Sequence, residues 1–560
     1  MSSSKKSPMN LFEKHKALIE RAQQAIYERT FYAAYPEHPK AYGEEAPKAG
    51  EEEYKNCLNN NFTGLLQGDA KEFAGEEVSP YTMTALGIKY PIYDSTEVIE
   101  KSKVAFKSWK KITTQERAGA LVETLEEIKK HFFAIAHATM HTTGQSYMMS
   151  FQASGPHSAD RALEPIALGL AELTRFPENI IWEKPMGKFS VKLEKTYSPV
   201  PKGIGLVIGC STFPVWNTLP GVYANLIAGN SVIIKPHPKA VLAIAIAVAA
   251  MQKSMKENGF DPCVVQLACD TSDTLITKKF SESPDIALID YTGSTAFGDY
   301  VESIPNKTVF TEKAGVNSVI LDSVNDLDSV MQNLAFSVSL YSGQMCTAPQ
   351  NFFIPASGVK GKDKNYSYEE VVAKLKESIL GITTNPKMGA GVFGSVQNDV
   401  TLQRAQNANS IGAAVVLETT AVKNEEFNSA RATSPVLLEV QSDAHHIFER
   451  ELFGPIAIAI KTKDTAESVK LAKQMALKHG ALTCAAYTTD VATEKMIAEE
   501  MQQAFTPVTF NLTGPIWVNQ HAAFSDFHVT GGNPAGNASF TNPEFVTRRF
   551  VWVGNRKMVL

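Results

Sequence analysis

Six cysteines are spread along the 560-residue chain, and two of them have neighbours that suit chemistry. Cys346 lies in YSGQMCTAPQN (341–351), among small and polar residues that would leave its thiol accessible to a substrate. Cys210, in IGCSTF, has a comparable setting. A thiolate is populated near neutral pH only beside positive charge or backbone amides, such as those of a helix N-terminus. Because most lone cysteines are inert core residues, both are candidate nucleophiles that need support from other motifs.

A second chemical candidate is the segment YTGSTAFG (291–298). It follows the β-rich run IALIDY, and Gly293, Ser294 and Thr295 can offer backbone N–H groups and hydroxyls to a phosphate where a helix begins. The alternative is an ordinary helix N-cap at Ser294 or Thr295. GIGLVIG (203–209) is rejected as a dinucleotide fingerprint, because its third glycine comes one position late and its glycines lie inside a strand.

The elements that would position these residues follow an alternating pattern. Helical stretches such as 240–258 separate short β-rich runs, which are residues 203–209, 231–235, 264–268 and 286–291. Such alternation predicts βαβ units and a parallel sheet whose ligands lie at the carboxyl ends of the strands. A further strand and helix series runs from Ser318 to about Tyr487. We therefore expect an α/β fold with two Rossmann-like parallel-sheet domains.

Two flanking regions complete the expected architecture. Residues 182–202 alternate polar and apolar side chains around Gly187, which predicts an antiparallel ribbon that projects towards another subunit. The β-prone C-terminal segment (543–560) is expected to pair with this ribbon. The first 95 residues begin with an amphipathic helix, continue through a stretch rich in Pro, Gly and Glu, and give no catalytic signal. From Asp94, which is expected to cap a helix, the chain continues with amphipathic helices.

Composition and charge exclude several classes of protein. Hydrophobic residues make up 44% and charged residues 20%, and the net charge of −5 leaves no basic field for nucleic acid or an anionic membrane. The longest nearly unbroken apolar run, Val241 to Met251, is about half the ~20 residues that span a bilayer. The N-terminus lacks an apolar signal segment, which predicts a cytoplasmic protein. The cysteines are too scattered for a disulfide framework, and no CxxC or histidine-rich pair indicates a metal site.

Five ordered motifs resemble those of the aldehyde dehydrogenase superfamily over roughly residues 95–560. They are FPVWNTLPGVYANLIAGNSVIIKPHP (213–238), YTGSTAFG (291–298), TEKAGVN (311–317), YSGQMCTA (341–348) and ELFGP (451–455). Within the superfamily, IGCSTFPVWN, IIKPHP, TEKAGVNS and AAFSDFH are similar to the PaaN-type enzymes of phenylacetic acid degradation, and the long N-terminal region fits that type too. The resemblance implies an enzyme that oxidises aldehydes with NAD(P).

The resemblance assigns the reaction to three side chains. Cys346 matches the nucleophile that attacks the aldehyde carbon to form a thiohemiacetal, which loss of hydride converts to a thioester. Asn217 matches the amide that holds the oxyanion together with the Cys346 backbone N–H. Glu312, 34 residues before Cys346, matches the general base that activates water to release the acid. Without the resemblance, Glu312 beside Lys313 would be interpreted as an exposed or ion-paired carboxylate.

The resemblance also implies a nucleotide site. The matching residues are Lys235 at the adenosine ribose and phosphate, Gly293 and Ser294 at the pyrophosphate, and Glu451 and Phe453 at the nicotinamide ribose. Many NAD-preferring members carry a carboxylate three positions after this lysine, where this chain has Pro238 between His237 and Lys239. Without that carboxylate, and with two potential cations, a 2′-phosphate would be tolerated. We therefore expect NADP, with NAD as the second option; alternatively, His237 and Lys239 simply face solvent.

The domain boundaries implied are an N-terminal extension (1–95), a cofactor-binding domain (96–185 and 201–311), a catalytic domain (312–519), and an oligomerisation arm with a C-terminal tail (186–200 and 520–560). Such an arm predicts a homodimer or homotetramer. The expected substrate is a CoA-linked semialdehyde of phenylacetate catabolism. Since the dehydrogenase pattern fills the chain beyond residue 95, ring opening would need a separate hydratase as partner.

Several alternatives stay open. Around Glu312 the family's Glu-Leu-Gly-Gly-Lys becomes Glu-Lys-Ala-Gly-Val, so coenzyme A rather than water could resolve the thioester in a CoA-acylating enzyme. A broad-specificity enzyme for simple aldehydes is another alternative, since Phe213, Trp216 and Tyr341 form either an apolar substrate wall or plain core packing. A silent binding scaffold is disfavoured by the joint presence of the three matched reaction residues. A cysteine hydrolase would need a histidine base, and no histidine stands in a comparable motif.

Overall fold

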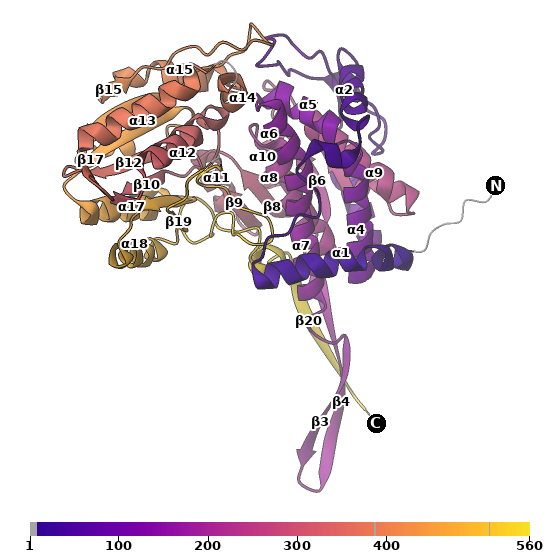
Figure 1. Cartoon of the computed structure of the whole chain (residues 1–560). Helices are drawn as coiled ribbons and strands as arrows, with labels where there is room; N and C mark the ends of the chain where they lie inside the picture. Colours follow the sequence, from indigo (N-terminus) through magenta and orange to yellow (C-terminus); the bar gives the residue numbers. More distant parts are fainter. Residues whose placement is uncertain (1–7, 386–387, 515, 560) are drawn as a thin grey trace.

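The computed structural model describes residues 8–385, 388–514 and 516–559. Figure 1 shows two α/β halves beside each other and a long ribbon that projects away from them. One half is built on a five-stranded sheet and the other on a seven-stranded sheet. The predicted α/β fold with two parallel-sheet units is therefore confirmed. The first seven residues of the expected N-terminal extension lie outside the described part of the chain.

The five-stranded sheet has the order β7-β6-β5-β8-β9, and its strand pairs are parallel. Its strands are β5 (Ile204–Ile208), β6 (Ser231–Lys235), β7 (Val265–Leu267), β8 (Ile286–Thr292) and β9 (Thr308–Glu312). The first four coincide with the predicted β-rich runs. They are joined through α8 (Pro214–Ile227), α9 (Leu242–Glu257) and α10 (Thr277–Glu282), and α11 (Thr295–Ser303) leads into β9. The carboxyl ends of β6, β8 and β9 thus bring candidate site residues to one edge.

The seven-stranded sheet has the order β15-β16-β17-β12-β10-β18-β19, with only the edge strand β15 antiparallel to its neighbour. The strands are β10 (Asn317–Leu321), β12 (Pro349–Pro355), β15 (Ala414–Leu417), β16 (Val436–Gln441), β17 (Ile456–Thr462), β18 (Cys484–Tyr487) and β19 (Val508–Phe510). The helices of this half are α12 (Leu327–Ser339), α13 (Tyr368–Thr383), α14 (Gly389–Phe393), α15 (Asp399–Gln406), α16 (His445–Phe448), α17 (Thr465–His479) and α18 (Val491–Gln503).

The projecting ribbon consists of β3 (Asn179–Met186), β4 (Phe189–Pro201) and the C-terminal β20 (Phe550–Met558) (Figure 1). β4 lies in the middle and pairs antiparallel with both neighbours, which confirms the predicted pairing of the C-terminal segment with the ribbon. Gly187, with a φ of 69°, makes the tight turn between β3 and β4. Large apolar side chains remain uncovered on the ribbon, among them Ile181 and Phe189, which are 64% and 65% exposed.

The N-terminal segment packs into the half that holds the five-stranded sheet. α1 (Pro8–Glu28) lies against α4 (Thr114–Lys129) and α7 (Ser158–Leu173), and its Leu11 and Ile19 are buried. The approach of α1 to α4 is close, since a Cβ built on Gly119 would lie 2.3 Å from the Phe12 backbone nitrogen. Residues before 95 therefore contribute to the core, while the boundary at residue 95 itself stays a prediction.

Smaller elements complete the described chain. The remaining helices are α2 (Ala46–Cys57), α3 (Ser95–Trp109), α5 (Phe132–Thr143), α6 (Tyr147–Gln152) and α19 (Pro543–Thr547). The remaining strands are β1 (Glu72–Ala74), β2 (Tyr90–Ile92), β11 (Ser323–Val324), β13 (Val359–Gly361) and β14 (Asn365–Tyr366). As predicted, the Asp94 carboxylate caps α3 by accepting from the first-turn N–H groups. Among the described helices, none combines the length and the apolar character that crossing a membrane requires.

Candidate active site

Cys346 lies in a tight loop that leads into β12. Just before it, Ser342 and Gly343 adopt left-handed backbone conformations, with φ of 49° and 63°. Glycine is required at position 343, because a Cβ there would lie 2.4 Å from the carbonyl oxygen of Gly454. The Asn317 amide donates to the Cys346 carbonyl at 2.8 Å. The sulfur is therefore held in place by a restrained backbone.

Glu312 and Asn217 reach the same place from two other elements. Glu312 is the last residue of β9, Asn217 lies in the first turn of α8, and both are buried. Asn217 Nδ2 lies 3.4 Å from Glu312 Oε2. The neighbouring Lys313 instead donates to Asp299 and Glu302, at 2.9 and 3.0 Å. The alternative of a Glu312 carboxylate paired at the surface beside Lys313 does not describe this arrangement.

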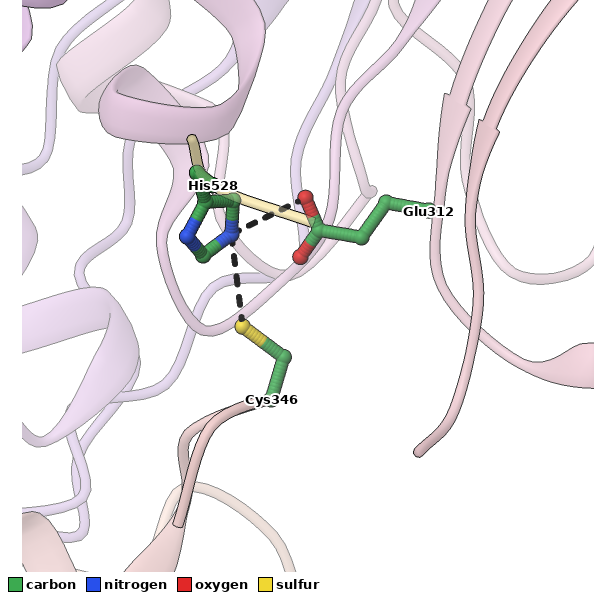
Figure 2. A group of neighbouring side chains, drawn as sticks. All are labelled: Glu312, Cys346 and His528. Carbon is green, nitrogen blue, oxygen red and sulfur yellow. Dashed lines mark hydrogen bonds and ion pairs between the residues drawn. The ribbon is translucent and has the colours of Figure 1, made fainter. Parts of the chain in front are cut away.

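A histidine completes the group (Figure 2). Nε2 of His528 lies 3.9 Å from the Cys346 sulfur and 3.2 Å from Glu312 Oε2. The imidazole is buried; it packs edge-on against Trp216 and stacks on Phe540, with ring centroids 4.7 and 5.4 Å away. The sulfur, the imidazole nitrogen and the carboxylate oxygen all lie within 4.8 Å of one another. Three segments far apart in the sequence therefore meet at one point.

The sequence shows no histidine in a motif comparable to that of a cysteine hydrolase, yet the structure places His528 beside Cys346. His528 stands 182 residues after the cysteine, so no local spacing connects the two. The available signal was the presence of two histidines, His521 and His528, at either end of the segment HAAFSDFH (521–528). The thiol, imidazole and carboxylate are also ligand types that zinc accepts. A search for CxxC or histidine-rich pairs cannot find the group of Glu312, Cys346 and His528, because these residues come together only in the folded chain.

The loop that carries His528 is anchored by a buried ion pair on α7. Arg161 and Glu164 are enclosed by protein, and their side chains meet at 2.9 Å. Arg161 also donates to the carbonyls of His521 and Asp526, at 3.1 and 3.4 Å. Glu164 accepts from a backbone N–H of the same loop. The pair also bonds the Thr541 hydroxyl, so it ties the backbone on both sides of His528 to α7.

The charges at the site favour a protonated thiol beside an ionised carboxylate. Burial raises the pKa of the Cys346 thiol well above its ordinary value, and the Glu312 carboxylate adds to the shift. Burial also acts to raise the pKa of Glu312, but the charge of His528 and hydrogen bonds from His528 and Cys346 outweigh it, so this pKa lies below its usual range. Glu312 Oε1 has no hydrogen-bond partner among the described residues. Because this oxygen is buried, it can accept a hydrogen bond only from a water or substrate atom that enters the site.

A pocket opens onto this group. Its lining includes Cys346, Asn217 and His528 together with the mostly apolar side chains of Met149, Ala153, Phe213, Trp216, Leu340, Met345 and Trp517. Phe213 and Trp216 thus form part of an apolar wall. Tyr341 is core packing instead: it is fully buried, lies 5.8 Å from the Phe213 ring, and donates its hydroxyl proton to the Thr143 carbonyl. An apolar pocket with a few convergent polar groups suits an organic aldehyde.

Cys210, the other candidate nucleophile, contacts the side chain of Asn217. Its thiol donates to Asn217 Oδ1 across 3.5 Å, which turns Nδ2 of that amide towards Glu312. Burial raises the pKa of Cys210 to about 11. Cys346 lines the pocket, and Cys210 stands behind Asn217. The two cysteines therefore have different surroundings, although their sequence settings are alike.

The expected nucleotide residues lie at the carboxyl edge of the five-stranded sheet. Lys235 ends β6, and Gly293 and Ser294 connect β8 to α11. Ser294 is the N-cap residue of α11, yet within the described structure its side chain makes no capping bond, so first-turn N–H groups remain available to an anion. A Cβ on Gly293 would lie 2.5 Å from the Tyr291 hydroxyl, so glycine keeps this turn compact. These residues fit the phosphates of a dinucleotide.

The surroundings of Lys235 differ from the expectation in one respect. Its Nζ lies 2.6 Å from Asp270 Oδ1, and both side chains are buried. Burial, with Lys235 and Lys239 nearby, lowers the pKa of His237 to about 4. His237 is therefore neutral at pH 7, so it is not one of the two cations expected to bind a 2′-phosphate. Lys239, the other expected cation, is exposed. Glu76 also faces His237, so this corner of the site holds two carboxylates.

Glu451 and Phe453 lie between α16 and β17 and are half-buried. Burial raises the pKa of Glu451 to about 7, against an opposing effect of Arg404. The Glu451 carboxylate contributes to the raised pKa of Cys346, so the two side chains are within electrostatic reach. Arg404 fixes the segment by donating to the Phe453 carbonyl at 2.5 Å. The Glu451 carboxyl therefore changes charge near neutral pH. Among the expected nucleotide residues, it is the one whose charge acts on the Cys346 thiol.

Comparisons with known proteins agree with this geometry. The profile of the aldehyde dehydrogenase family matches residues 76–540. The crystal structure of an NAD-dependent aldehyde dehydrogenase from Burkholderia multivorans is 40% identical, with a TM-score of 0.95 over 100% of both chains. An N-succinylglutamate 5-semialdehyde dehydrogenase from Acinetobacter baylyi is 29% identical over 49% of this chain and 54% of its own length.

A malonate-semialdehyde dehydrogenase from Lacticaseibacillus casei is 23% identical over 89% of this chain and 96% of its own length. The family match covers the Cys346, Glu312 and His528 segments and the nucleotide edge together. The chain therefore belongs to the aldehyde dehydrogenase family, as an oxidoreductase that acts on aldehydes with NAD(P).

Proposed function

We propose that the chain oxidises its aldehyde to a carboxylic acid through a thioester on Cys346, with Asn217 and Glu312 as partners. The observation that carries the proposal is the convergence of these three side chains, from a restrained loop, a helix start and a strand end, beside one apolar pocket. Attack by the sulfur places negative charge on the carbonyl oxygen. An amide donor positioned for that oxygen contributes about 2.7–4 kcal/mol in comparable sites.

The residues of the chain divide the remaining work. Lys235, Ser294 and the start of α11 would hold the nucleotide, whose nicotinamide, when bound, accepts the hydride that the oxidation releases. Glu451 would hold the ribose nearest the thiol. The apolar wall of Phe213 and Trp216 excludes water from the side of the pocket that holds the substrate.

The position of the Glu312 carboxylate favours water as the acceptor of the acyl group. Glu312 is ionised, its Oε1 has no partner among the described residues, and it lies at the thiol. It can therefore take a proton from an attacking water. The substitutions at Ala314 and Val316 leave the carboxylate turned towards Cys346. The runner-up is transfer to coenzyme A.

Product analysis separates these two outcomes. The enzyme is incubated with aldehyde and NAD(P), with and without free coenzyme A, and the products are identified by mass spectrometry. Free acid formed at the same rate without coenzyme A supports hydrolysis. Acyl-CoA as the sole product, with no turnover in the absence of coenzyme A, would establish the acylating alternative.

For the substrate we propose a CoA-linked semialdehyde of phenylacetate catabolism, delivered by a separate ring-opening hydratase. The resemblance of the IGCSTFPVWN, TEKAGVNS and AAFSDFH segments supports the finer assignment, and the names of two relatives support the semialdehyde class. A kcat/KM comparison across CoA-linked semialdehydes, free semialdehydes and benzaldehyde tests it. A higher kcat/KM for benzaldehyde would replace the proposal with a broad-specificity enzyme.

For the nucleotide we propose NAD in place of the NADP expected from the sequence. The support is that His237 is neutral, that the Asp270 carboxylate pairs with Lys235, and that Glu76 faces His237, so the corner expected to accept a 2′-phosphate is less cationic than the sequence suggested. The similarity to an NAD-dependent enzyme of 40% identity points the same way. The ratio of kcat/KM for NAD to that for NADP tests this choice, and a ratio below one would restore NADP.

For assembly we propose a homodimer or homotetramer in which the ribbon of β3, β4 and β20 contacts a second chain. The support is the uncovered apolar surface of the ribbon, which includes Ile181 and Phe189. We also propose the domain limits expected from the sequence, at residues 185, 200, 311 and 519. Sedimentation at micromolar concentration tests it, and a monomer there would contradict it.

A further inference from the structure

We propose that His528 is the general base and the general acid of Cys346: it takes the thiol proton as the sulfur attacks and returns it as the thioester breaks. The inference rests on the proposed function, because it gives the proton of that same thiol a destination. Its starting point is the arrangement in Figure 2, where one imidazole nitrogen faces both the sulfur and the carboxylate.

The geometry limits what the imidazole can do. Nε2 of His528 lies 3.9 Å from the Cys346 sulfur and 3.2 Å from Glu312 Oε2, so one atom can accept the thiol proton and then share it with the carboxylate. Trp216 and Phe540 enclose the ring. An enclosed ring keeps Nε2 on the proton path without the cost of ordering it during the reaction.

Glu312 alone is a poor acceptor for this proton. Burial raises the pKa of the Cys346 thiol well above its ordinary value, whereas an ordinary glutamate carboxyl has a pKa of about 4.3, so direct transfer from sulfur to carboxylate is uphill. Histidine is the side chain whose protonation changes between pH 5 and 8. A carboxylate within ion-pair distance stabilises the imidazolium that forms. Glu312 is then the counter-ion during attack and the base for water afterwards.

Other titratable groups surround Cys346 and His528, but none of them replaces His528 as the acceptor of the thiol proton. Those that act on these side chains are His521, Arg161, Cys210 and Glu451. His521 is the one whose ring touches the His528 ring, at 5.6 Å between centroids. Burial lowers the pKa of His521 to about 3, so it stays neutral. It is therefore a matched histidine that lines the same pocket but carries no proton to the sulfur.

The proton balance closes over the two half-reactions. In acylation the S–H bond of Cys346 breaks, sulfur bonds to the carbonyl carbon, the C=O π pair moves to oxygen, and the proton goes to Nε2. Re-formation of C=O expels hydride to NAD(P), which the established activity supplies. In deacylation Glu312 takes a proton from water as the water oxygen bonds to the thioester carbon. The C–S bond breaks, the sulfur recovers its proton from Nε2, and Glu312 releases one proton to solvent.

The experiment follows alkylation of Cys346 by iodoacetamide in the full-length protein, without aldehyde or nucleotide, by peptide mass spectrometry. In the wild type we expect a rate nearly independent of pH between about 7 and 9, because the imidazole removes the proton. In His528→Gln we expect a rate at least about tenfold lower at pH 7. The variant's rate should climb about tenfold per pH unit, since it depends on the small thiolate fraction of a high-pKa thiol.

His521→Gln is the control in the same pocket, and its alkylation profile should match the wild type. A His528→Gln protein with the wild-type rate and pH profile would overturn the proposal and leave Glu312 as the base. Thermal melting and circular dichroism establish that each variant is folded. His528→Asn provides a second replacement of the imidazole.

The wild type alone provides a test if both replacements unfold. A proton in flight during attack should slow alkylation about twofold in D2O, as expected for general-base catalysis. No isotope effect, together with a wild-type rate that climbs about tenfold per pH unit, would refute a role for the imidazole.

The readouts separate this inference from the proposed function. If the wild type forms no acid from any aldehyde but shows the expected alkylation profile, the proposed function fails and the thiol–imidazole pair stands. If acid forms normally but His528→Gln alkylates like the wild type, the proposed function stands and the inference fails.

Discussion

The reaction centre and the nucleotide edge of this protein are built in opposite ways. At the nucleotide edge, Lys235 and Ser294 come from strand ends within successive βαβ units of one sheet. At the reaction centre, Cys346 comes from the half with the seven-stranded sheet, Glu312 from the other half, and His528 from the C-terminal loop. The edge depends on local chain geometry, whereas the centre depends on contacts between distant segments.

The C-terminal loop is the part of the centre that depends most on such contacts. It joins the edge of β9 through a bridge between Glu312 and Gly536, where a Cβ would lie 2.6 Å from the Thr311 carbonyl oxygen. On its other side it is held by Arg161 and Glu164. Changes far from the thiol in sequence should therefore damage the centre and spare the edge.

The largest expected effect comes from removing the proposed nucleophile. Cys346→Ala should lower aldehyde-dependent formation of NADH by at least about 10⁴-fold, because the covalent route is lost. Cys210→Ala keeps the nucleophile and disturbs only the Asn217 amide, so its loss should be much smaller. Steady-state rates of the two variants, with nucleotide affinity measured by fluorescence, check the assignment. Equal losses in both would mean that the different surroundings of the two cysteines in the structure do not give them different roles.

Next comes the buried anchor of the loop. Arg161→Met leaves Glu164 buried without its partner and should lower the free energy of unfolding by about 3–5 kcal/mol. In the folded fraction, aldehyde oxidation should fall while nucleotide affinity stays near the wild-type value. Lys55→Met removes a pair with Glu51 on α2 in which both side chains are exposed, and it should cost about 1 kcal/mol or less. Denaturant unfolding measures both, and similar costs would remove the distinction between anchor and surface pair.

A smaller effect is expected from Asn217, the proposed oxyanion donor. Asn217→Ala should lower kcat by about 10²–10³-fold with little change in nucleotide affinity, because the amide acts when charge develops on the substrate oxygen. Initial rates at saturating nucleotide measure the change in kcat. A loss confined to KM would place Asn217 in substrate binding alone.

The smallest effect concerns pH at the nucleotide edge. Because the pKa of Glu451 is raised to about 7, the side chain is neutral below that pH and ionised above it. If the carboxylate accepts hydrogen bonds from a ribose, KM for the nucleotide should fall by up to about tenfold as pH rises through 7. Glu451→Gln should abolish this dependence. Glu449→Gln, at a carboxyl whose pKa is already lowered to about 2, should retain it.

The sequence predicted the edge better than the centre, for a physical reason. Alternating β-rich and helical runs identified β5 to β8, and the position of Lys235 and Gly293 at strand ends followed from them. The cationic role expected of His237 failed, because burial next to Lys235 is a property of the packed sheet and not of the dipeptide His-Pro.

By itself, the sequence determined the α/β class, the ribbon with its C-terminal partner strand, and the identity of a cysteine, an amide and a carboxylate suited to aldehyde oxidation. Each of these is written in local periodicity or in a short motif. Only the tertiary structure decided that Cys210 contacts the Asn217 amide and that His528 lies beside Cys346. Proximity across 182 residues arises from packing of the C-terminal loop on α7 and β9, and no local pattern encodes it.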